Sequence, residues 1–592
     1  MADTARFNES AGLPKHVIEE VTQPDGSVRF FARARKGPFA LAWEEIPVEW
    51  VDQQWFRHDR FFSAGPFRLL SATLRLEPDG AQGATGHYTL QVEPANLFGT
   101  LLLKTAFFGA VEKSFALLAA SADDWAAGQR DVPFDSDGAS LTPSSRSRLD
   151  RVLARIAESP NDHGLSRRLA DWIMSAPEVD LVRIRPIELA RKWGSTEPDT
   201  IEMCLQSVKD GLLELRWDLL CPRCRGAKAT VTSLDRLPHG AHCDSCNIDY
   251  DADFSRNVEM TFHPYPAIRE IPEGEFCLFG PMSTPHVKVQ VTLGPGERRS
   301  IPARIAPGEY RLRTLETGGE AEFTYRGGGF PGALIDTDTV TTDGVSAAGT
   351  VEAENRTAFR RTLIVESRDW VADALTAERV TVLQAFRDLF SHQILRPGDQ
   401  VGISQVALLF TDLRGSTALY EHVGDARAYG LVREHFAFLA RAVRICNGSV
   451  VKTIGDAVMA AFHDPADAIR AAIRVQQGVQ EFNRDSSGED IVIKLGVHCG
   501  PCIAVTLSER FDYFGTTINM AARLQGESEG GDIVLSEDIV RDPAVAEILA
   551  AYPLEAAQSH FKGFETPVSF LRLSASALAP QKGSSTDINP ER

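Results

Sequence analysis

The sequence predicts a multidomain α+β protein that ends in an α/β domain. Three observations support this fold class. The length of 592 residues corresponds to about four domains of ordinary size. Apolar residues make up 43% and charged residues 24% of the chain, which is the composition of a globular protein with several buried cores. Strand-like and helix-like apolar periodicities also occur in separate blocks along the chain.

Charge and targeting signals exclude several classes of protein. The 62 Lys and Arg residues against 81 Asp and Glu residues give a formal net charge of -19, so nucleic acid is not an expected partner of the whole chain. The N-terminus lacks a signal-peptide pattern, and charged residues interrupt the longest apolar stretch, near 97–120. We therefore expect a cytoplasmic protein without a membrane span.

Residues 1–145 predict a regulatory α+β domain. Period-two alternation predicts strands at 28–35, 39–46 and 67–76, followed by a helical stretch at 95–120. The segments WEEIPVEWV, RFFSAGPFRLL and TLRLEP resemble the START-like helix-grip superfamily, in which a curved sheet wraps a long helix around an apolar cavity. This resemblance implies that an apolar small molecule could bind the domain. The clustered tryptophans also fit a simple packed β core.

Residues 146–218 resemble a winged helix-turn-helix. Two short helices, at 185–193 and 198–209, flank a Gly-Ser-Thr turn and precede the apolar run LLELRWDLL. Residues 151–230 hold 13 basic and 12 acidic residues, whereas a DNA reader usually has a clearly basic face. We therefore expect a packing or dimerising role, with DNA reading as the alternative.

Residues 219–262 contain two CxxC pairs and predict a zinc ribbon. Cys221 and Cys224 form the first pair, Cys243 and Cys246 form the second, and 18 residues separate the pairs. Four thiolates make the tetrahedral ligand set that Zn²⁺ prefers, and they leave no position open for water. One structural Zn²⁺ is expected, and four unligated thiols are the alternative.

The next two segments carry no recognisable chemistry. Residues 263–368 contain five strand-like runs, VKVQVTL, RSIPARI, GEYRLRTL, AEFTYR and TAFRRTLIVE, and predict a β-sandwich. Residues 369–402 predict one amphipathic coupling helix. Its apolar side comprises Leu375, Val382, Leu383, Phe386, Leu389 and Phe390. This side could form a dimer contact that couples signals, or could be docked in the ordinary way.

Residues 403–575 form the predicted α/β domain, and residues 576–592 predict a disordered tail. Asp412 ends the apolar run VALLFTD, and Asp456 lies in a tight turn between two apolar strands. Two carboxylates at neighbouring strand ends suit a hard divalent cation such as Mg²⁺, although each alone could cap a strand end.

The segment after Asp412 predicts a phosphate-binding helix start. Gly415 permits close approach of the backbone to a ligand, Ser416 is a good N-cap, and Thr417 follows it. Free N–H groups at a helix N-terminus attract anions. A metal ligand followed by a phosphate cradle is a logical order for a nucleoside triphosphate site.

Four motifs in order, FTDLRGST, VVKTIGDAVMAAF, FDYFGTTINMAAR and FKG, resemble the class III nucleotidyl cyclase catalytic domain, a ferredoxin-like α/β fold. The resemblance implies two Mg²⁺ or Mn²⁺ ions per active site and a homodimer with shared sites. It assigns roles to seven residues: Asp412 and Asp456 bind metal, Lys452 and Asp512 bind the purine, Asn519 positions the ribose, Arg523 stabilises the transition state and Lys562 contacts the terminal phosphates.

The purine pair favours ATP as the substrate. Asp512 can accept a hydrogen bond from the adenine amino group, and it would repel the guanine oxygen at the same position. The prediction is an adenylate cyclase that forms cyclic AMP under the control of N-terminal modules. The alternatives are a guanylate cyclase, an ATP-binding pseudocyclase and a DNA-binding regulator. The Gly530-Gly531-Asp532 sequence is superficially similar to the diguanylate cyclase motif but lacks its next acid.

Overall fold

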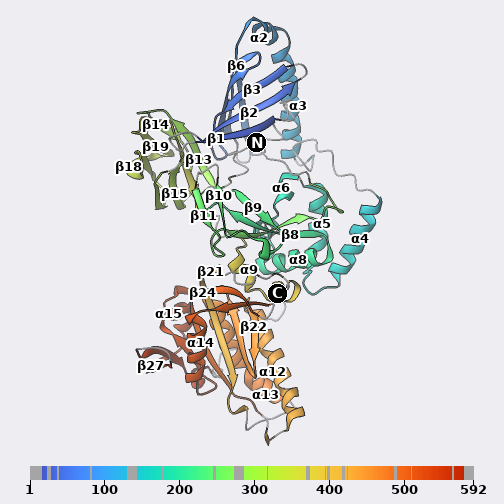
Figure 1. The fold of residues 1–592 in the computed structure, drawn as a ribbon, viewed down its shortest axis with the longest axis vertical. Helices are drawn as coiled ribbons and strands as arrows, with labels where there is room; N and C mark the ends of the chain where they lie inside the picture. The colour runs from blue at the N-terminus through green and yellow to red at the C-terminus, as the bar shows by residue number, and fades with distance from the viewer. Residues whose placement is uncertain are drawn as a thin grey trace.

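The computed structural model places the N-terminal sheet and the C-terminal domain at opposite ends of an elongated chain (Figure 1). It describes residues 16–578 except 23–27, 37–38, 81–82, 128, 130–142, 177, 224, 244–247, 272–283, 285, 317, 369–373, 392, 394, 396–400, 417–420, 423, 486–489, 508–509 and 563–565. Among the described helices, none is long and apolar enough to cross a membrane.

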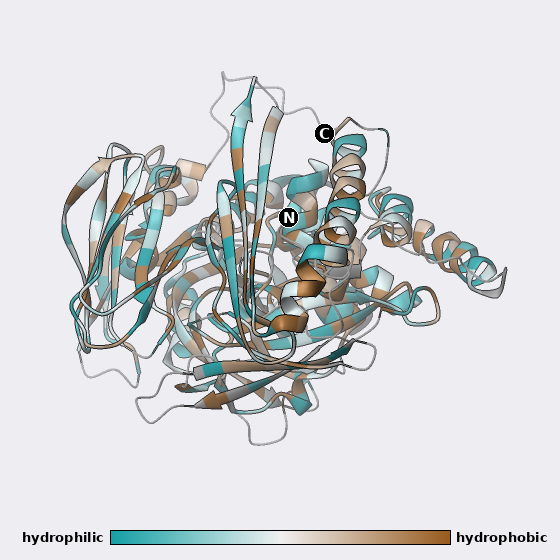
Figure 2. Cartoon of the chain, turned by 90° about the horizontal axis from the view of Figure 1, so that it is seen from above, coloured by the Kyte–Doolittle hydropathy of each residue, from teal (hydrophilic) through white to brown (hydrophobic). Residues whose placement is uncertain are grey.

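The N-terminal region is a sheet accompanied by a long helical segment. Its strands are β1 (His16–Thr22), β2 (Val28–Lys36), β3 (Phe39–Glu45), β4 (Glu49–Val51), β5 (Trp55–Ala64), β6 (Phe67–Asp79) and β7 (Gly83–Pro94). The helical segment comprises α2 (Leu97–Leu102), the π-helix η1 (Leu103–Phe107) and α3 (Phe108–Ala126). The three predicted strands and the predicted helix are therefore confirmed, and Figure 2 shows polar and apolar residues alternating along many strands. The sheet with a helix beside it agrees with the START-like prediction but does not establish it.

The predicted β-sandwich is present, but it is not a separate module. Strand β4 pairs with β13 (Val287–Leu293), so Trp50 and Val51 lie opposite Gln290 and Val289. This pairing joins the N-terminal strands to β20 (Arg361–Ser367), β15 (Gly308–Thr314) and β16 (Glu320–Tyr325) in one 11-stranded sheet. A second sheet contains β14 (Arg298–Pro302), β19 (Thr350–Asn355), β17 (Gly329–Ile335) and β18 (Val340–Ala348). Strands from the two predicted regions, 1–145 and 263–368, therefore belong to one sheet, so these regions do not form separate domains in the structure.

The middle region is helical and packs around a small sheet. Its helices are α4 (Pro143–Ala157), α5 (Ser166–Ser175), α6 (Glu178–Val182), α7 (Pro186–Trp193) and α8 (Glu197–Asp210). The sheet has the order β12 (Val258–Pro264), β8 (Leu213–Leu220) and β9 (Ala227–Val231). The second helix of the predicted helix-turn-helix, α8, buries Ile201, Met203 and Leu205 in the largest core. This burial favours the packing role over DNA reading.

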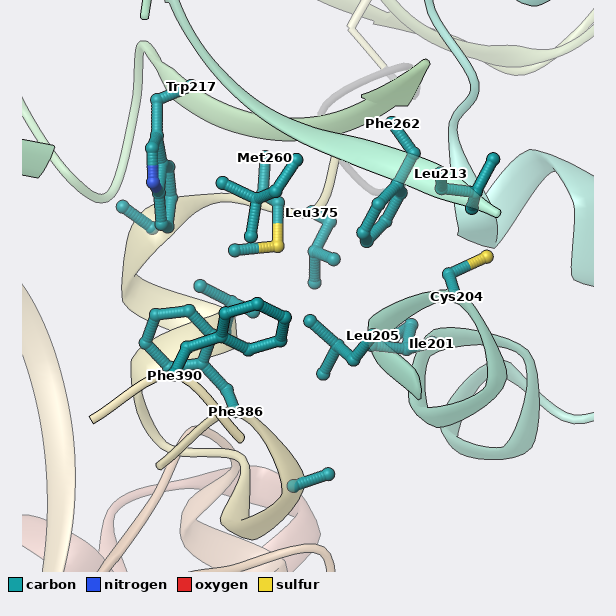
Figure 3. Close-up of a cluster of buried hydrophobic side chains, with 14 of the residues drawn as sticks. Ile201, Cys204, Leu205, Leu213, Trp217, Met260, Phe262, Leu375, Phe386 and Phe390 are labelled. Atoms are coloured by element: carbon teal, nitrogen blue, oxygen red, sulfur yellow. The ribbon is translucent and has the colours of Figure 1, made fainter. Parts of the chain in front are cut away.

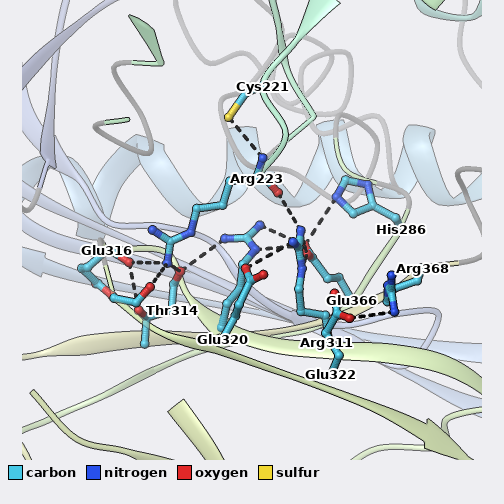
Figure 4. A network of polar contacts seen from close by, with 12 residues as sticks. Cys221, Arg223, His286, Arg311, Thr314, Glu316, Glu320, Glu322, Glu366 and Arg368 are labelled. Atoms are coloured by element: carbon cyan, nitrogen blue, oxygen red, sulfur yellow. Dashed lines mark hydrogen bonds and ion pairs between the residues drawn. The ribbon is translucent and has the colours of Figure 1, made fainter. Parts of the chain in front are cut away.

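The cysteine-rich segment packs against the sandwich. Cys221 and Cys243 lie together in one buried cluster, whereas Cys224 and Cys246 lie outside the described residues. Cys243 ends β10 (Gly240–Cys243), which pairs with β11 (Ile248–Asp251). The Arg223 guanidinium donates to the carbonyl oxygens of Thr314 at 3.0 Å and Glu316 at 2.8 Å (Figure 4). Arg223, which lies within the first CxxC pair, therefore anchors this segment to the end of β15 and the loop that follows it.

The coupling segment forms two short helices, so the prediction of one continuous helix is wrong. Helix α9 (Ala377–Thr381) and helix α10 (Gln384–Leu389) are separated at Leu383, whose ψ of 130° is extended rather than helical. The break lets both helices bury apolar side chains. Phe386 and Phe390 face Trp217, Met260 and Phe262 of the middle region (Figure 3). The predicted dimer contact is therefore wrong for this apolar side, which the chain itself covers, and ordinary docking is confirmed.

The C-terminal domain is an eight-stranded sheet with helices on both faces. Its strands are β21 (Val401–Leu413), β22 (Ser449–Ile454), β23 (Ala457–Phe462), β24 (Ile493–Leu507), β25 (Arg510–Phe514), β26 (Ile533–Ser536), β27 (Leu554–Ser559) and β28 (Val568–Leu573). Its helices are α12 (Asp425–Ile445), α13 (Pro465–Asp485), α14 (Thr516–Glu527), α15 (Glu537–Val540), α16 (Pro543–Leu549) and α17 (Ala575–Leu578). Helix α17 lies at the start of the predicted tail. Residues 579–592 lie outside the described residues.

The two faces of the central strand β21 belong to different cores. Ala407 and Leu409 pack with α12 and α13, whereas Leu408 and Phe410 join the core that contains α8 and α10. This alternation follows from the two-residue period of a strand. The middle region therefore completes the second face of the cyclase-like sheet, and the two regions share one core.

A buried carboxyl at this junction predicts a measurable pH dependence. Glu378 of α9 is 6% exposed and accepts a hydrogen bond from the Gln405 amide at 3.2 Å. Burial, together with the nearby Asp253 charge, raises the pKa of Glu378 to about 7. The folded state therefore retains the proton above the unfolded pKa, so Glu378 lowers stability as pH rises toward about 7.

We expect Glu378→Gln to raise the unfolding free energy by about 2 kcal/mol at pH 8, with little gain at pH 4.5. Glutamine removes the buried charge and keeps the acceptor for Gln405. Chemical denaturation at both pH values measures the effect, with the exposed Glu555→Gln as the matched control. An equal gain at both pH values would contradict the explanation.

Candidate active site

Asp412 lies at the end of a strand that is fixed on both sides. Strand β21 pairs with β23 and β24, and Asp412 stands opposite Lys494. Burial raises the pKa of Asp412, and the charge of Asp456 raises it further, whereas Lys494 acts in the opposite direction. The structure thus brings the two predicted carboxylates close enough to repel each other.

Asp456 occupies a two-residue hairpin turn between β22 and β23, because Ile454 pairs with Ala457. Gly455 supplies the left-handed conformation of this turn, with a φ of 65°. The Oδ2 atom of Asp456 is buried and has no hydrogen-bond donor among the described residues. An unpaired buried carboxylate oxygen is costly, and a cation would remove that cost. The pair therefore fits a divalent metal ion.

The two carboxylates suit a magnesium ion that shares its ligands with water and substrate better than a metal ion enclosed by protein ligands alone. In the described part of the chain, no group of three or more His, Cys, Asp or Glu side chains forms a metal cluster. Mg²⁺ usually binds one or two carboxylates and takes its remaining ligands from water and substrate phosphates. Two carboxylates without a third acidic or imidazole ligand match that pattern.

Three neighbours of the acidic pair escaped the sequence analysis. His435 of α12 is fully buried, and burial lowers its pKa to about 4, so it is neutral at physiological pH. Lys494 donates to the Gly526 carbonyl at 3.1 Å, and Gln525 has a buried Nε2 atom without a hydrogen-bond partner among the described residues. All three come from segments distant in sequence or outside the four motifs, so no local pattern marked them.

The predicted purine-binding residues meet. Lys452 of β22 and Asp512 of β25 form an ion pair with 2.6 Å between Nζ and Oδ2. The Tyr513 amide donates to Asp512 Oδ1 at 2.8 Å, so the carboxylate is held from its other oxygen. Asp512 is buried, whereas Lys452 is partly exposed. Side chains 60 residues apart thus form one ion pair within one chain.

The predicted ribose and transition-state residues lie together on α14. Asn519 and Arg523 are both exposed and are four residues apart, which places them on one side of the helix. Gly496 lets this helix approach β24, because a Cβ atom there would lie 2.1 Å from the Gln525 nitrogen. Helix α14 is therefore positioned by a close contact that only glycine allows.

The remaining predicted ligand residues are described only in part. Gly415 has a φ of 70° and is exposed, as expected for a loop that approaches a ligand. Ser416 is half-buried, and Thr417 lies outside the described residues. Lys562 is exposed and lies in a turn. The structure does not bring Lys562 into contact with the acidic pair.

The Gly530-Gly531-Asp532 sequence has a structural role. Asp532 is buried and accepts hydrogen bonds from the amides of Gly530 at 2.9 Å and Glu529 at 3.2 Å. It also pairs with Arg572 at 2.9 Å. Its oxygens are therefore occupied in holding a turn, and the similarity to the diguanylate cyclase motif is superficial, as expected.

Residues 400–546 match the adenylate and guanylate cyclase catalytic domain family. The C-terminal region is a class III cyclase catalytic domain. Residues 148–275, which include α5 to α8 and the cysteine-rich segment, match a family of unknown function, DUF5939. The matched residues include the first three of the four motifs and both acids, whereas FKG lies beyond residue 546.

Curated relatives are similar to the same region. An adenylate cyclase of Mycosarcoma maydis is 34% identical over 160 residues, which cover 24% of this chain and 6% of that protein. An adenylate cyclase of Anabaena cylindrica is 29% identical over 158 residues, which cover 24% of this chain and 32% of that protein. The chain thus spans less than a third of the length of these relatives.

Solved structures are similar over the C-terminal region as well. The adenylyl cyclase CyaB from P. aeruginosa is 22% identical, with a TM-score of 0.27, and the match covers 30% of this chain and 96% of that chain. The guanylyl cyclase Cya2 is 18% identical, with the same TM-score of 0.27 and coverage of 30% and 93%.

Proposed function

We propose that this protein is an adenylate cyclase that converts ATP into 3′,5′-cyclic AMP and pyrophosphate. The observation that carries the proposal is the pair Asp412 and Asp456, with one buried carboxylate oxygen that lacks a donor among the described residues. The family match of residues 400–546 supports it.

Asp412 and Asp456 are the residues that hold two Mg²⁺ or Mn²⁺ ions in this proposal. Ions held there would lower the pKa of the ribose 3′-hydroxyl and would neutralise charge on the triphosphate. Asn519 orients the ribose, and the fixed charge of Arg523 stabilises oxygens that gain negative charge. Lys562 and the segment 415–417 contact the phosphates. The hydroxyl attacks the α-phosphorus in line, and pyrophosphate leaves.

The pair Lys452 and Asp512 selects adenine in this proposal. Asp512 accepts a hydrogen bond from the adenine amino group. The 2.6 Å contact between Lys452 and Asp512 places both side chains where one base can reach them. A guanylate cyclase would need a donor in place of this carboxylate. A pseudocyclase that binds ATP without turnover would retain the purine pair but lack the reaction.

A homodimer would make two complete sites. We propose that the metal-binding acids of one chain meet the purine pair, Asn519 and Arg523 of the other chain. Support comes from the exposure of Asn519 and Arg523, and of apolar neighbours such as Phe514, which is 63% exposed, and Ile454, which is 54% exposed. Exposed apolar side chains bordered by polar groups are typical of an interaction surface.

The upstream modules are proposed to regulate the enzyme in the cytoplasm. Helices α2 and α3 expose large apolar side chains, including Leu97 at 89%, Leu101 at 59% and Leu117 at 64%. An apolar small molecule bound between this helical segment and the sheet would cover such surface. A DNA-binding regulator is less consistent with the structure, because α8 is buried.

The first test is the reaction itself. We expect the full chain to form cyclic AMP from ATP with Mg²⁺ or Mn²⁺, and Asp456→Asn to reduce kcat/KM by at least about a hundredfold because metal affinity is lost. Chromatography of the products measures the rate. The exposed Asp490→Asn is the control. Equal rates for the Asp456 variant and the wild type would refute the metal assignment.

The second test is purine choice. Lys452→Glu combined with Asp512→Cys should lower the ATP:GTP ratio of kcat/KM by at least about tenfold, because the acceptor for the adenine amino group is lost. Initial rates with each nucleotide give the ratio. If both rates fall together and the ratio stays the same, the purine pocket has been placed wrongly.

The third test concerns zinc. We propose that Cys221, Cys224, Cys243 and Cys246 hold one structural Zn²⁺, since Cys221 and Cys243 share a buried cluster and the Arg223 amide donates to Cys221 Sγ at 3.4 Å. Elemental analysis should find one zinc per chain, and Cys243→Ser should release it. Cys446→Ser is the control. Zinc-free wild-type protein would contradict the proposal.

A further inference from the structure

Helix α10 touches both strands that carry the purine pair. The Oε1 atom of Gln384 accepts a hydrogen bond from the Val450 amide of β22 at 2.8 Å. The Nη1 atom of Arg387 donates to the Phe511 carbonyl of β25 at 3.2 Å. Gln384 and Arg387 are three residues apart, so they lie on one side of the helix. One short helix thus contacts β22 two residues before Lys452 and β25 one residue before Asp512.

The contact of Arg387 with β25 has several components. Its guanidinium lies 5.7 Å from the ring centre of Phe511 and 5.4 Å from that of Tyr513. Its Nε atom donates to the Thr381 carbonyl at 2.8 Å, and the Tyr513 hydroxyl reaches the same carbonyl at 3.4 Å. Phe254 of the middle region stacks on Phe511 at 6.5 Å. Phe511 and Tyr513 of β25 are therefore held by residues upstream of the cyclase domain.

Strand geometry transmits this contact to Asp512. Successive side chains of a strand point to opposite faces, so Phe511 and Tyr513 face α10 while Asp512 faces away from it, toward Lys452. The Tyr513 amide also holds the Asp512 carboxylate directly, at 2.8 Å. A shift of the two aromatic residues would therefore move the acceptor that reads the purine.

Strand β22, which carries Lys452, is irregular close to that residue. The pairing of β22 with β23 is interrupted between Val450 and Lys452, where the register shifts. A bulged strand is locally less constrained by its partner. The hydrogen bond from Val450 to Gln384 supplies a constraint at this irregular point, from the opposite side to β23.

We propose that α10 is a clamp for the purine pocket, in which Arg387 positions Asp512 and Gln384 positions Lys452. The inference rests on the proposed function, because it concerns how that site distinguishes adenine from guanine. Since Phe386 of the same helix is buried against Trp217 of the middle region, a change in the middle region would move the clamp. Purine recognition is thereby coupled to the upstream modules.

The test separates positioning from general stability. Arg387→Met keeps an unbranched aliphatic side chain but removes its hydrogen bonds and charge, and Arg387→Lys restores the charge without the planar fork. The matched control is Arg444→Gln on α12, which removes the exposed contact to Asp388 of α10 at 3.2 Å but leaves the hydrogen bond from Gln384 to Asp388 at 2.7 Å in place. Full-length variants are compared for KM and kcat with ATP and with GTP, and for thermal unfolding.

We expect Arg387→Met to raise KM for ATP and lower the ATP:GTP ratio of kcat/KM by about tenfold, as for one displaced hydrogen bond to the base. Gln384→Ala should act in the same direction, Arg387→Lys should recover part of the ratio, and Arg444→Gln should keep the wild-type ratio. Equal loss of kcat for both nucleotides, at unchanged KM and ratio, would show a merely structural role and overturn the inference.

The two proposals fail in different ways. A wild-type chain that forms no cyclic AMP, or prefers GTP, refutes the proposed function together with the inference that rests on it. A wild-type chain that prefers ATP, with variants of unchanged ratio that unfold near the wild-type temperature, refutes the clamp alone. A variant that does not fold is replaced by Gln384→Ala, which acts on the other strand.

Discussion

The mutual repulsion of Asp412 and Asp456 is the constraint around which the C-terminal domain is arranged. Strand pairing on both sides of β21 prevents Asp412 from moving away, and a glycine-dependent hairpin turn fixes Asp456. Burial raises the pKa of Asp412, and the charge of Asp456 raises it further. The sheet therefore supplies the energy that keeps two like charges together, and such a site gains most from a divalent cation.

A second constraint is the core shared by the middle region and the cyclase domain. Leu408 and Phe410 of β21 lie in the same cluster as Phe386 and Trp217. Buried apolar contacts of this kind are close-packed, so a displacement on one side is transmitted to the other. The middle region and the cyclase domain therefore contact each other directly through packed side chains.

Much of the C-terminal domain could be predicted from sequence because its signals are local. The two acids could be recognised from their positions at strand ends, and the purine pair and the α14 residues from the resemblance of four motifs to the class III nucleotidyl cyclase catalytic domain. The motifs also placed Lys452 and Asp512, which meet although a long segment separates them.

The features that the sequence did not reveal depend on distant partners. The pairing of β4 with β13 joins two regions more than 200 residues apart, and no periodicity encodes such a partner. The amphipathic pattern of 369–395 was read correctly as apolar on one side, but the extended Leu383 breaks the helix to fit Trp217 and Phe262. His435 and Arg387 are likewise single residues whose surroundings arise only from the tertiary structure.

The most direct measurement of the central claim is a count of bound metal ions. Electron paramagnetic resonance of Mn²⁺, titrated with a non-hydrolysable ATP analogue, reports binding without turnover. The account predicts two strongly bound Mn²⁺ ions per active site in the wild-type chain, and loss of both in the chain that carries Asp412→Asn and Asp456→Asn. Equal Mn²⁺ binding by the two proteins would contradict it.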